Sequence, residues 1–192
     1  MSAIWKVPAL PPPDAETVLR YARGAHSAGV DDLLREVLQE GSQVVEARLC
    51  YAIFDITVCK NRVDFGTVFA ESRDLANHLA GYRRAVLFAA TVGAGADRAI
   101  ARAERVSPAR ALLLDAFFSE RVETLCDCFT TGFNDPARRF SPGYGDLPLD
   151  FQKDLFRVLD CPRRIGLTLG ENLLMIPTKS VTAIIGVKES LS

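Results

Sequence analysis

Hydrophobic residues along this chain recur with two spacings, one typical of helices and one typical of strands. Apolar steps of three and four predict helices over residues 15–23, 30–41, 72–78, 96–104, 107–129 and 148–160. Short apolar runs rich in β-branched and aromatic residues predict strands over residues 49–59, 63–69, 84–93, 165–170 and 180–187. We therefore expect an α+β fold: a single domain with a mainly antiparallel sheet, packed helices, and more helix than strand.

Capping and turn residues place the boundaries of these elements. Asp14, Ser72 and Ser107 each precede a helical pattern, as N-caps do. Residues 60–62 separate two strand patterns and predict a hairpin turn. The run of three prolines at 11–13 favours an extended backbone. We expect residues 1–13 to form an extended lead-in and residues 14–192 to form the domain.

The longest predicted helix, 107–129, carries an apolar stripe with acidic residues around it. Glu120, Glu123 and Asp127 fall away from the stripe and are expected to face water. Asp115 lies on the shoulder of the stripe, at the edge of the buried surface. A carboxylate in that position needs a partner.

Composition excludes several classes of function. The 192 residues include 23 basic and 24 acidic side chains with no block of like charge, so we expect neither nucleic-acid nor membrane binding. No stretch approaches the roughly 18 apolar residues of a membrane span, and we expect a soluble, cytoplasmic protein. Five cysteines at irregular spacing suit reduced thiols better than disulfides or a metal site.

A Gly93-Ala-Gly95 sequence follows the predicted strand 84–93 and opens a helix. Dinucleotide-binding turns share this beginning, but their third small residue is replaced here by Arg98. A tight strand-to-helix turn is the simpler interpretation. A nucleotide-dependent oxidoreductase is kept as an alternative.

The loop before the last predicted helix contains the most suggestive chemistry in the chain. Pro142-Gly143 suits the centre of a type II turn, which would expose backbone N–H and C=O groups to a ligand. Arg139 can hold a carboxylate bidentately, and the ring of Tyr144 can stack on a heterocycle. A ligand that combines an amino acid with a base would satisfy all three groups. An ordinary loop, with Arg139 in a surface ion pair, is the alternative.

An ordered set of short motifs over residues 84–187 resembles the activation domain of cobalamin-dependent methionine synthase. The set comprises Phe88–Gly93, Leu114–Phe117, Arg139–Tyr144, Pro148, Leu169–Asn172, Met175–Pro177 and Ser180–Ala183. The sequences Ser141-Pro142-Gly143-Tyr144 and Lys179-Ser180-Val181 are similar to those of free-standing proteins of this family.

The resemblance implies binding of S-adenosylmethionine and reductive remethylation of cob(II)alamin. It implies that the cobalamin is carried by a partner, either a cobalamin-dependent methionine synthase or another corrinoid protein, with flavodoxin or a similar electron donor. The chain would then act in trans as a component of a methyltransferase, with no general acid or nucleophile of its own. The ligand contacts implied by position are Asp115, Arg139, Ser141, Gly143 and Tyr144. The alternative is a docking protein for a corrinoid protein that does not bind S-adenosylmethionine.

Overall fold

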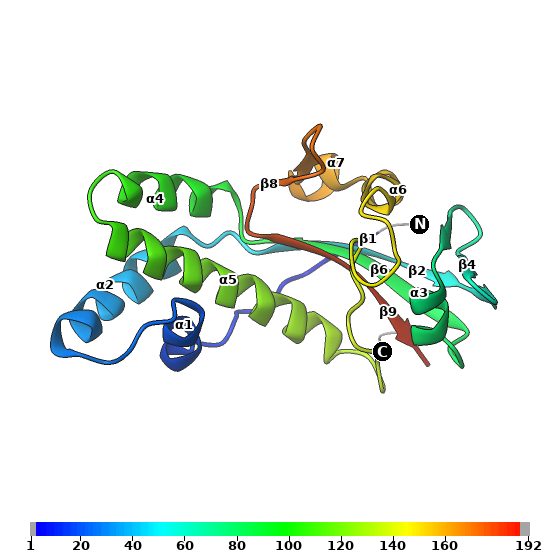
Figure 1. Cartoon of the computed structure of the whole chain (residues 1–192), viewed down its shortest axis with the longest axis horizontal. Coiled ribbons are helices and arrows are strands. Elements are labelled where there is room, and N and C mark those ends of the chain that lie inside the picture. Colours follow the sequence, from blue (N-terminus) through cyan, green and yellow to red (C-terminus); the bar gives the residue numbers. More distant parts are fainter. Residues whose placement is uncertain (1–2, 189–192) are drawn as a thin grey trace.

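The computed structural model describes residues 3–188 as one α+β domain around a four-stranded antiparallel sheet in the order β1-β2-β6-β9 (Figure 1). These strands are β1 (Ala3–Trp5), β2 (Arg48–Asp55), β6 (Arg84–Thr91) and β9 (Ser180–Val187). Two small sheets accompany them, formed by β3 (Thr57–Cys59), β4 (Arg62–Asp64) and β5 (Phe69–Glu71), and by β7 (Thr168–Leu169) and β8 (Met175–Ile176). The predicted fold class is confirmed, and helices hold more residues than strands.

Both faces of the main sheet are buried, because alternate residues of each strand point to opposite sides. On one face, Cys50, Leu87 and Ile184 pack against α3 (Arg73–His78), α6 (Phe151–Leu159) and α7 (Cys161–Ile165). On the other face, Leu49, Phe88 and Ile185 pack against the C-terminal part of α5 (Pro108–Thr130).

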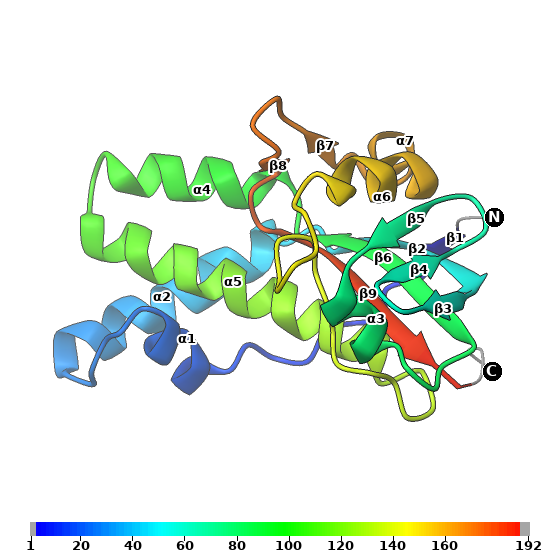
Figure 2. The ribbon, with the colours of Figure 1, turned by 45° about the vertical axis from the view of Figure 1, so that its right-hand side comes forward.

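The N-terminal part of α5 extends beyond the sheet and belongs to a separate cluster of helices (Figure 2). Its neighbours there are α1 (Ala15–Tyr21), α2 (Ala28–Val44) and α4 (Ala94–Glu104). The molecule therefore has a helical part and a part built on the sheet, and α5 connects the two. No helix within residues 3–188 is both long and apolar enough to cross a membrane.

The predicted caps form as expected. Asp14 accepts a hydrogen bond from the N–H of Glu16, and Ser107 accepts one from the N–H of Arg110. Part of the predicted lead-in forms a strand: β1 pairs with β2 at the edge of the sheet. Residues 1–2 of the predicted lead-in and 189–192 of the predicted domain lie outside the described residues.

Several strand and helix boundaries were predicted wrongly. The apolar run 49–59 is two strands in different sheets, because the chain breaks at Ile56, whose N–H bonds to the carbonyl of Arg83. The run 63–69 likewise divides between β4 and β5. The helix expected at 148–160 begins only at Phe151 and ends at Leu159, because the next residue, Asp160, has a left-handed backbone. The short helix α7 follows, leaving only two residues of the strand expected at 165–170.

The turn at Gly93 and Gly95 serves close packing. A Cβ at Gly93 would lie 2.9 Å from Cβ of Glu46, and one at Gly95 would lie 2.6 Å from Cγ1 of Val44. The preceding strand β6 is antiparallel to both of its neighbours, whereas a dinucleotide-binding turn belongs to a parallel βαβ unit. The glycines therefore allow the turn to approach the end of α2, and the dinucleotide interpretation is not supported.

Gly41 marks a close approach between helices and gives a first testable prediction. A Cβ at this position would lie 2.4 Å from Cε1 of Phe117, a fully buried ring. Although alanine favours a helix, the overlap should make Gly41→Ala destabilising by about 1–3 kcal/mol in chemical denaturation. In the same helix, a Cβ added at Gly29 would meet no atom within 4 Å. Gly29→Ala is therefore the control, expected to leave stability unchanged or raise it by about 0.5–1 kcal/mol; equal effects would contradict the packing argument.

Candidate ligand-binding groove

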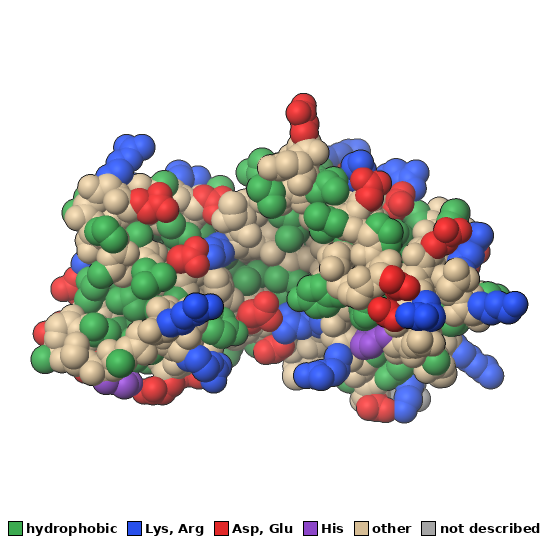
Figure 3. Space-filling view, viewed as in Figure 1, with side chains coloured by type: hydrophobic (Ala, Val, Ile, Leu, Met, Phe, Trp, Pro, Cys, Tyr) green, Lys and Arg blue, Asp and Glu red, His purple; other side chains and the backbone are tan. Residues whose placement is uncertain are grey.

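Within residues 3–188, a groove of about 650 Å³ lies where the helical part meets the sheet. Figure 3 shows this hollow between the two parts, with hydrophobic side chains inside it. Small-molecule sites occupy roughly 300–1,000 Å³. The groove is lined by residues of α5, the loop 138–144, α6, the β7–β8 connection and the start of β9: Glu123, Arg138, Arg139, Ser141, Pro142, Tyr144, Leu149, Gln152, Leu173, Leu174, Met175, Thr178, Ser180, Val181 and Thr182.

The loop 138–147 forms one wall and leaves the sheet beside the groove. Phe140 exchanges both backbone hydrogen bonds with Ile184 on the outer edge of β9. The chain then turns away, with the carbonyl of Ser141 accepting from the N–H of Tyr144 at 3.0 Å. Gly143 has φ +91°, so the predicted type II turn is present, with glycine where a positive φ is required.

The same loop is fastened to α3 at two points. The carboxylate of Asp146 accepts from the hydroxyl of Ser72 at 2.5 Å and from the N–H of Arg73 at 3.0 Å. These bonds, with the Ser72 hydroxyl as the largest cause, lower the pKa of Asp146. At the other end, Nε2 of His78 lies 2.6 Å from the carbonyl of Arg138. The turn is therefore held in place before any ligand arrives.

The exposed backbone expected of this turn is only partly present. The N–H of Gly143 donates to the carbonyl of Leu147 at 2.9 Å, the N–H of Tyr144 is used within the turn, and Pro142 has none. The central N–H groups of the turn are therefore already bonded and are not free for a ligand. The prediction that it presents both donors and acceptors is corrected accordingly.

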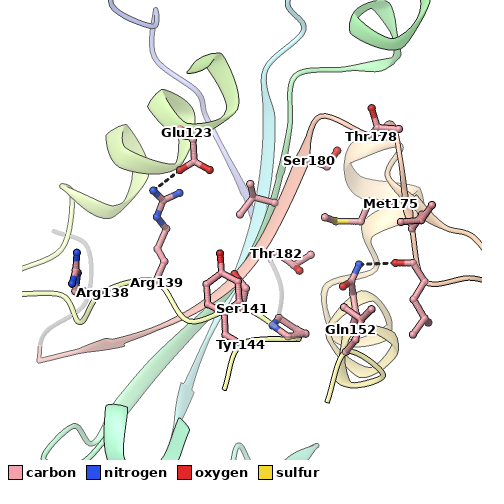
Figure 4. A pocket seen from close by; sticks show the side chains of 15 residues that line it. Glu123, Arg138, Arg139, Ser141, Tyr144, Gln152, Met175, Thr178, Ser180 and Thr182 are labelled. Atoms are coloured by element: carbon pink, nitrogen blue, oxygen red, sulfur yellow. Dashed lines mark hydrogen bonds and ion pairs between the residues drawn. The ribbon is translucent and has the colours of Figure 1, made fainter. Parts of the chain in front are cut away.

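Arg139 lies on the groove wall and contacts two acids of α5, of which Figure 4 shows Glu123. Its Nη2 donates to Glu123 at 2.7 Å and to Asp127 at 3.1 Å. Both acids were expected to face water. Asp127 does, with a side chain 66% exposed, whereas Glu123 is half-buried beside Arg139. Burial raises the pKa of the neighbouring Cys126 thiol to about 12, although the charge of Arg139 opposes this shift. Both ion pairs use Nη2, and a guanidinium has five N–H donors, so Arg139 retains donors for a ligand anion.

Asp115 is not among the residues that line the groove. Its carboxylate lies 2.7 Å from Nζ of Lys179, which also contacts the hydroxyl of Ser119 at 3.0 Å. The prediction that this acid needs a partner is confirmed, and the partner is a lysine with a side chain only 15% exposed.

Of the residues predicted to contact a ligand, Arg139, Ser141 and Tyr144 line the groove and Gly143 lies in the turn between them. Gln152, Thr182 and Met175 were not predicted. Gln152 is 4% exposed, and the only hydrogen bond of its side chain to a described residue is a long one of 3.4 Å to the carbonyl of Leu173. Met175 and Thr182 belong to motifs that carry the resemblance, but those motifs do not mark them as groove residues. No local signal marks Gln152, since α6, β8 and β9 meet only in the folded chain.

Comparisons with known proteins identify the fold. No family model matches the chain, and no curated protein matches it. Among solved structures, the crystal structure of the MetH reactivation domain bound to AdoHcy matches with a TM-score of 0.73 and 12% identity, covering 98% of this chain and 78% of that one. The chain therefore has the fold of that reactivation domain, and the resemblance to the activation domain of methionine synthase is supported by structure.

Proposed function

We infer that this chain binds S-adenosylmethionine in the groove and supports the reductive remethylation of cob(II)alamin on a partner protein. The observation that carries the proposal is the position of the Arg139–Tyr144 loop: it lines the groove between the helical part and the sheet, in a fold of which one solved example is bound to AdoHcy. The partner would be a cobalamin-dependent methionine synthase or another corrinoid methyltransferase, with flavodoxin or a similar protein as electron donor.

The side chains of the groove fit the chemical parts of such a ligand. Arg139 supplies a cation for the methionyl carboxylate, and the nearby carboxylate of Glu123 suits the ammonium group. Tyr144 is 59% exposed and presents its ring for stacking, while Ser141 and Gly143 form the wall beside it. Asp115, paired with Lys179 outside the lining, would act on the ligand through that lysine or after its displacement.

The chemistry of the proposed reaction places few demands on the protein. S-adenosylmethionine supplies a methyl group from its sulfonium, and one external electron reduces the partner's cob(II)alamin, so that methylcobalamin and S-adenosylhomocysteine are formed. The chain's own residues need only hold the ligand in a fixed orientation and limit access of water.

The test is a spectroscopic assay with a purified corrinoid protein in the cob(II)alamin state. With S-adenosylmethionine, reduced flavodoxin and this chain present, we expect loss of the cob(II)alamin absorption and appearance of methylcobalamin. The control omits the chain. Equal rates with and without it, for both a methionine synthase lacking an activation domain and a second corrinoid methyltransferase, would contradict the proposal.

A docking protein that does not bind S-adenosylmethionine is the second candidate. It is favoured by the ion pairs that already engage Arg139 and Asp115, and by the exposed side chains of Tyr144, Leu149 and Leu174 around the groove. Such a protein would form a complex with a corrinoid protein, measurable by gel filtration, whose affinity does not change when S-adenosylmethionine is added.

A further inference from the structure

The groove runs along an open edge of the main sheet. Ser180, Val181 and Thr182 all line it, although consecutive side chains of a strand point to opposite faces. A hollow that touches three successive residues must lie beside the strand rather than above it. The close view in Figure 4 agrees, with the first part of β9 between Arg139 on one side and Gln152 on the other.

The hydrogen-bonding pattern shows which backbone groups face this edge. The N–H and C=O of Ile184 point outward to Phe140, and the C=O of Gly186 points outward to Ala137. Because this direction alternates along a strand, the N–H and C=O of Thr182 and the C=O of Ser180 point outward as well. Lys179 precedes Ser180, so its carbonyl should point to the opposite side, toward β6. It does, since it accepts a hydrogen bond from the N–H of Val92.

These outward groups have no partner among the described residues. The loop that pairs with β9 leaves it after Phe140, and the N–H of Ser180 turns back to the carbonyl of Thr178 at 2.9 Å. The C=O of Ser180 therefore remains as a free acceptor, and the N–H of Thr182, two residues further on, remains as a free donor. An open strand edge of this kind readily binds a complementary donor and acceptor.

We propose that this open edge of β9 reads the base of the ligand, with the Ser180 carbonyl accepting from the 6-amino group of adenine and the Thr182 N–H donating to ring nitrogen N1. The inference rests on the proposed function and specifies its site. The central N–H groups of the 142–144 turn are already bonded, so the turn cannot supply this donor. A 6-oxo purine has an acceptor at position 6 and a hydrogen on N1. Its carbonyl would face the Ser180 carbonyl and its N1–H would face the Thr182 N–H, so neither hydrogen bond could form.

The first test uses the wild-type chain and four ligands in calorimetric titrations. We expect S-adenosylhomocysteine and its 7-deaza analogue to bind within threefold of each other, because N7 is not read. The 1-deaza analogue should bind about 10-fold more weakly, and S-inosylhomocysteine about 100-fold more weakly, through the loss or reversal of one or two hydrogen bonds. Equal affinity for S-adenosylhomocysteine and the 1-deaza analogue would overturn the strand-edge site while leaving the proposed function intact. No binding of any of the four, either to the chain alone or with a cob(II)alamin-loaded corrinoid protein present, would overturn the proposed function and the strand-edge site with it.

The second test removes the donor from the protein. Proline is tolerated in an edge strand where its nitrogen faces outward, so Thr182→Pro deletes the proposed donor without deleting a bond to β6. We expect this variant to bind S-adenosylhomocysteine about 10-fold more weakly and to lose its preference over the 1-deaza analogue. The wild-type chain, which keeps the N–H, is the reference in the same titrations. Retention of the preference in folded Thr182→Pro would contradict the assignment, and if that variant does not fold, the ligand series decides.

Discussion

Replacing Arg139 by alanine is expected to weaken binding of S-adenosylhomocysteine by about 10–100-fold. The side chain is 25% exposed and lies on the groove wall, where a carboxylate can bind to the guanidinium donors that its acid partners leave unused. The loss corresponds to about 1.5–3 kcal/mol for a charge-assisted hydrogen bond. Calorimetric titration of the variant beside the wild type measures it directly.

Two further variants separate this role from general effects of charge. Arg138 precedes Arg139 and also lines the groove, but it forms no ion pair with a described residue. Arg138→Ala removes the same charge and should change affinity by less than threefold. Arg139→Lys keeps the charge but loses the planar fork, and should give an intermediate loss. If Arg138→Ala and Arg139→Ala weaken binding equally, the assignment of the carboxylate to Arg139 is wrong.

The largest loss of stability is expected at the buried ion pair of Glu120 and Arg121, which are both 4% exposed. Arg121 donates from Nε to Glu120 at 2.5 Å and from Nη1 to the carbonyl of Pro11 at 2.6 Å. Arg121→Met would leave the Glu120 carboxylate buried without its charge partner and would release the proline-rich segment from α5. We expect the free energy of unfolding to fall by about 3–5 kcal/mol in urea denaturation.

A surface ion pair provides the control for this substitution. Arg35 contacts Asp32 at 3.0 Å, with both side chains mostly exposed, and Arg35→Met should change stability by less than about 1 kcal/mol. The double variant Glu120→Gln/Arg121→Met removes the stranded charge and should recover part of the lost stability. A loss below about 1 kcal/mol for Arg121→Met alone would show that the pair contributes little.

The parts of the fold that could be predicted from sequence depend on neighbouring residues. The cap at Ser107 and the turn at Pro142-Gly143 each require only side-chain chemistry within a few residues, and both are present. The apolar stripe of α5 was also readable, since its period is set by the helix itself.

The errors arise where distant segments decide the outcome. Glu120 was expected in water, but its burial depends on Arg121 and on Pro11, which is 110 residues from that arginine. The run 49–59 continues to be apolar across the break at Ile56, so composition alone could not reveal a change of sheet.

The candidate site could be predicted only where its residues are close together in the sequence. Arg139, Ser141 and Tyr144 belong to one short motif, and the fold brings that motif to the groove. Gln152 carries no motif, and the motif that contains Thr182 does not reveal an open strand edge. They become relevant only because α6 and β9 lie opposite the loop, and because the loop leaves β9 after Phe140.

The measurement that tests the central claim most directly is a calorimetric titration of the intact chain with S-adenosylmethionine and S-adenosylhomocysteine. It should be made alone and with a cob(II)alamin-loaded corrinoid protein present. The account predicts saturable binding of one ligand per chain, lost or strongly weakened in Arg139→Ala. Absence of saturable binding under both conditions would contradict it and would favour a docking protein.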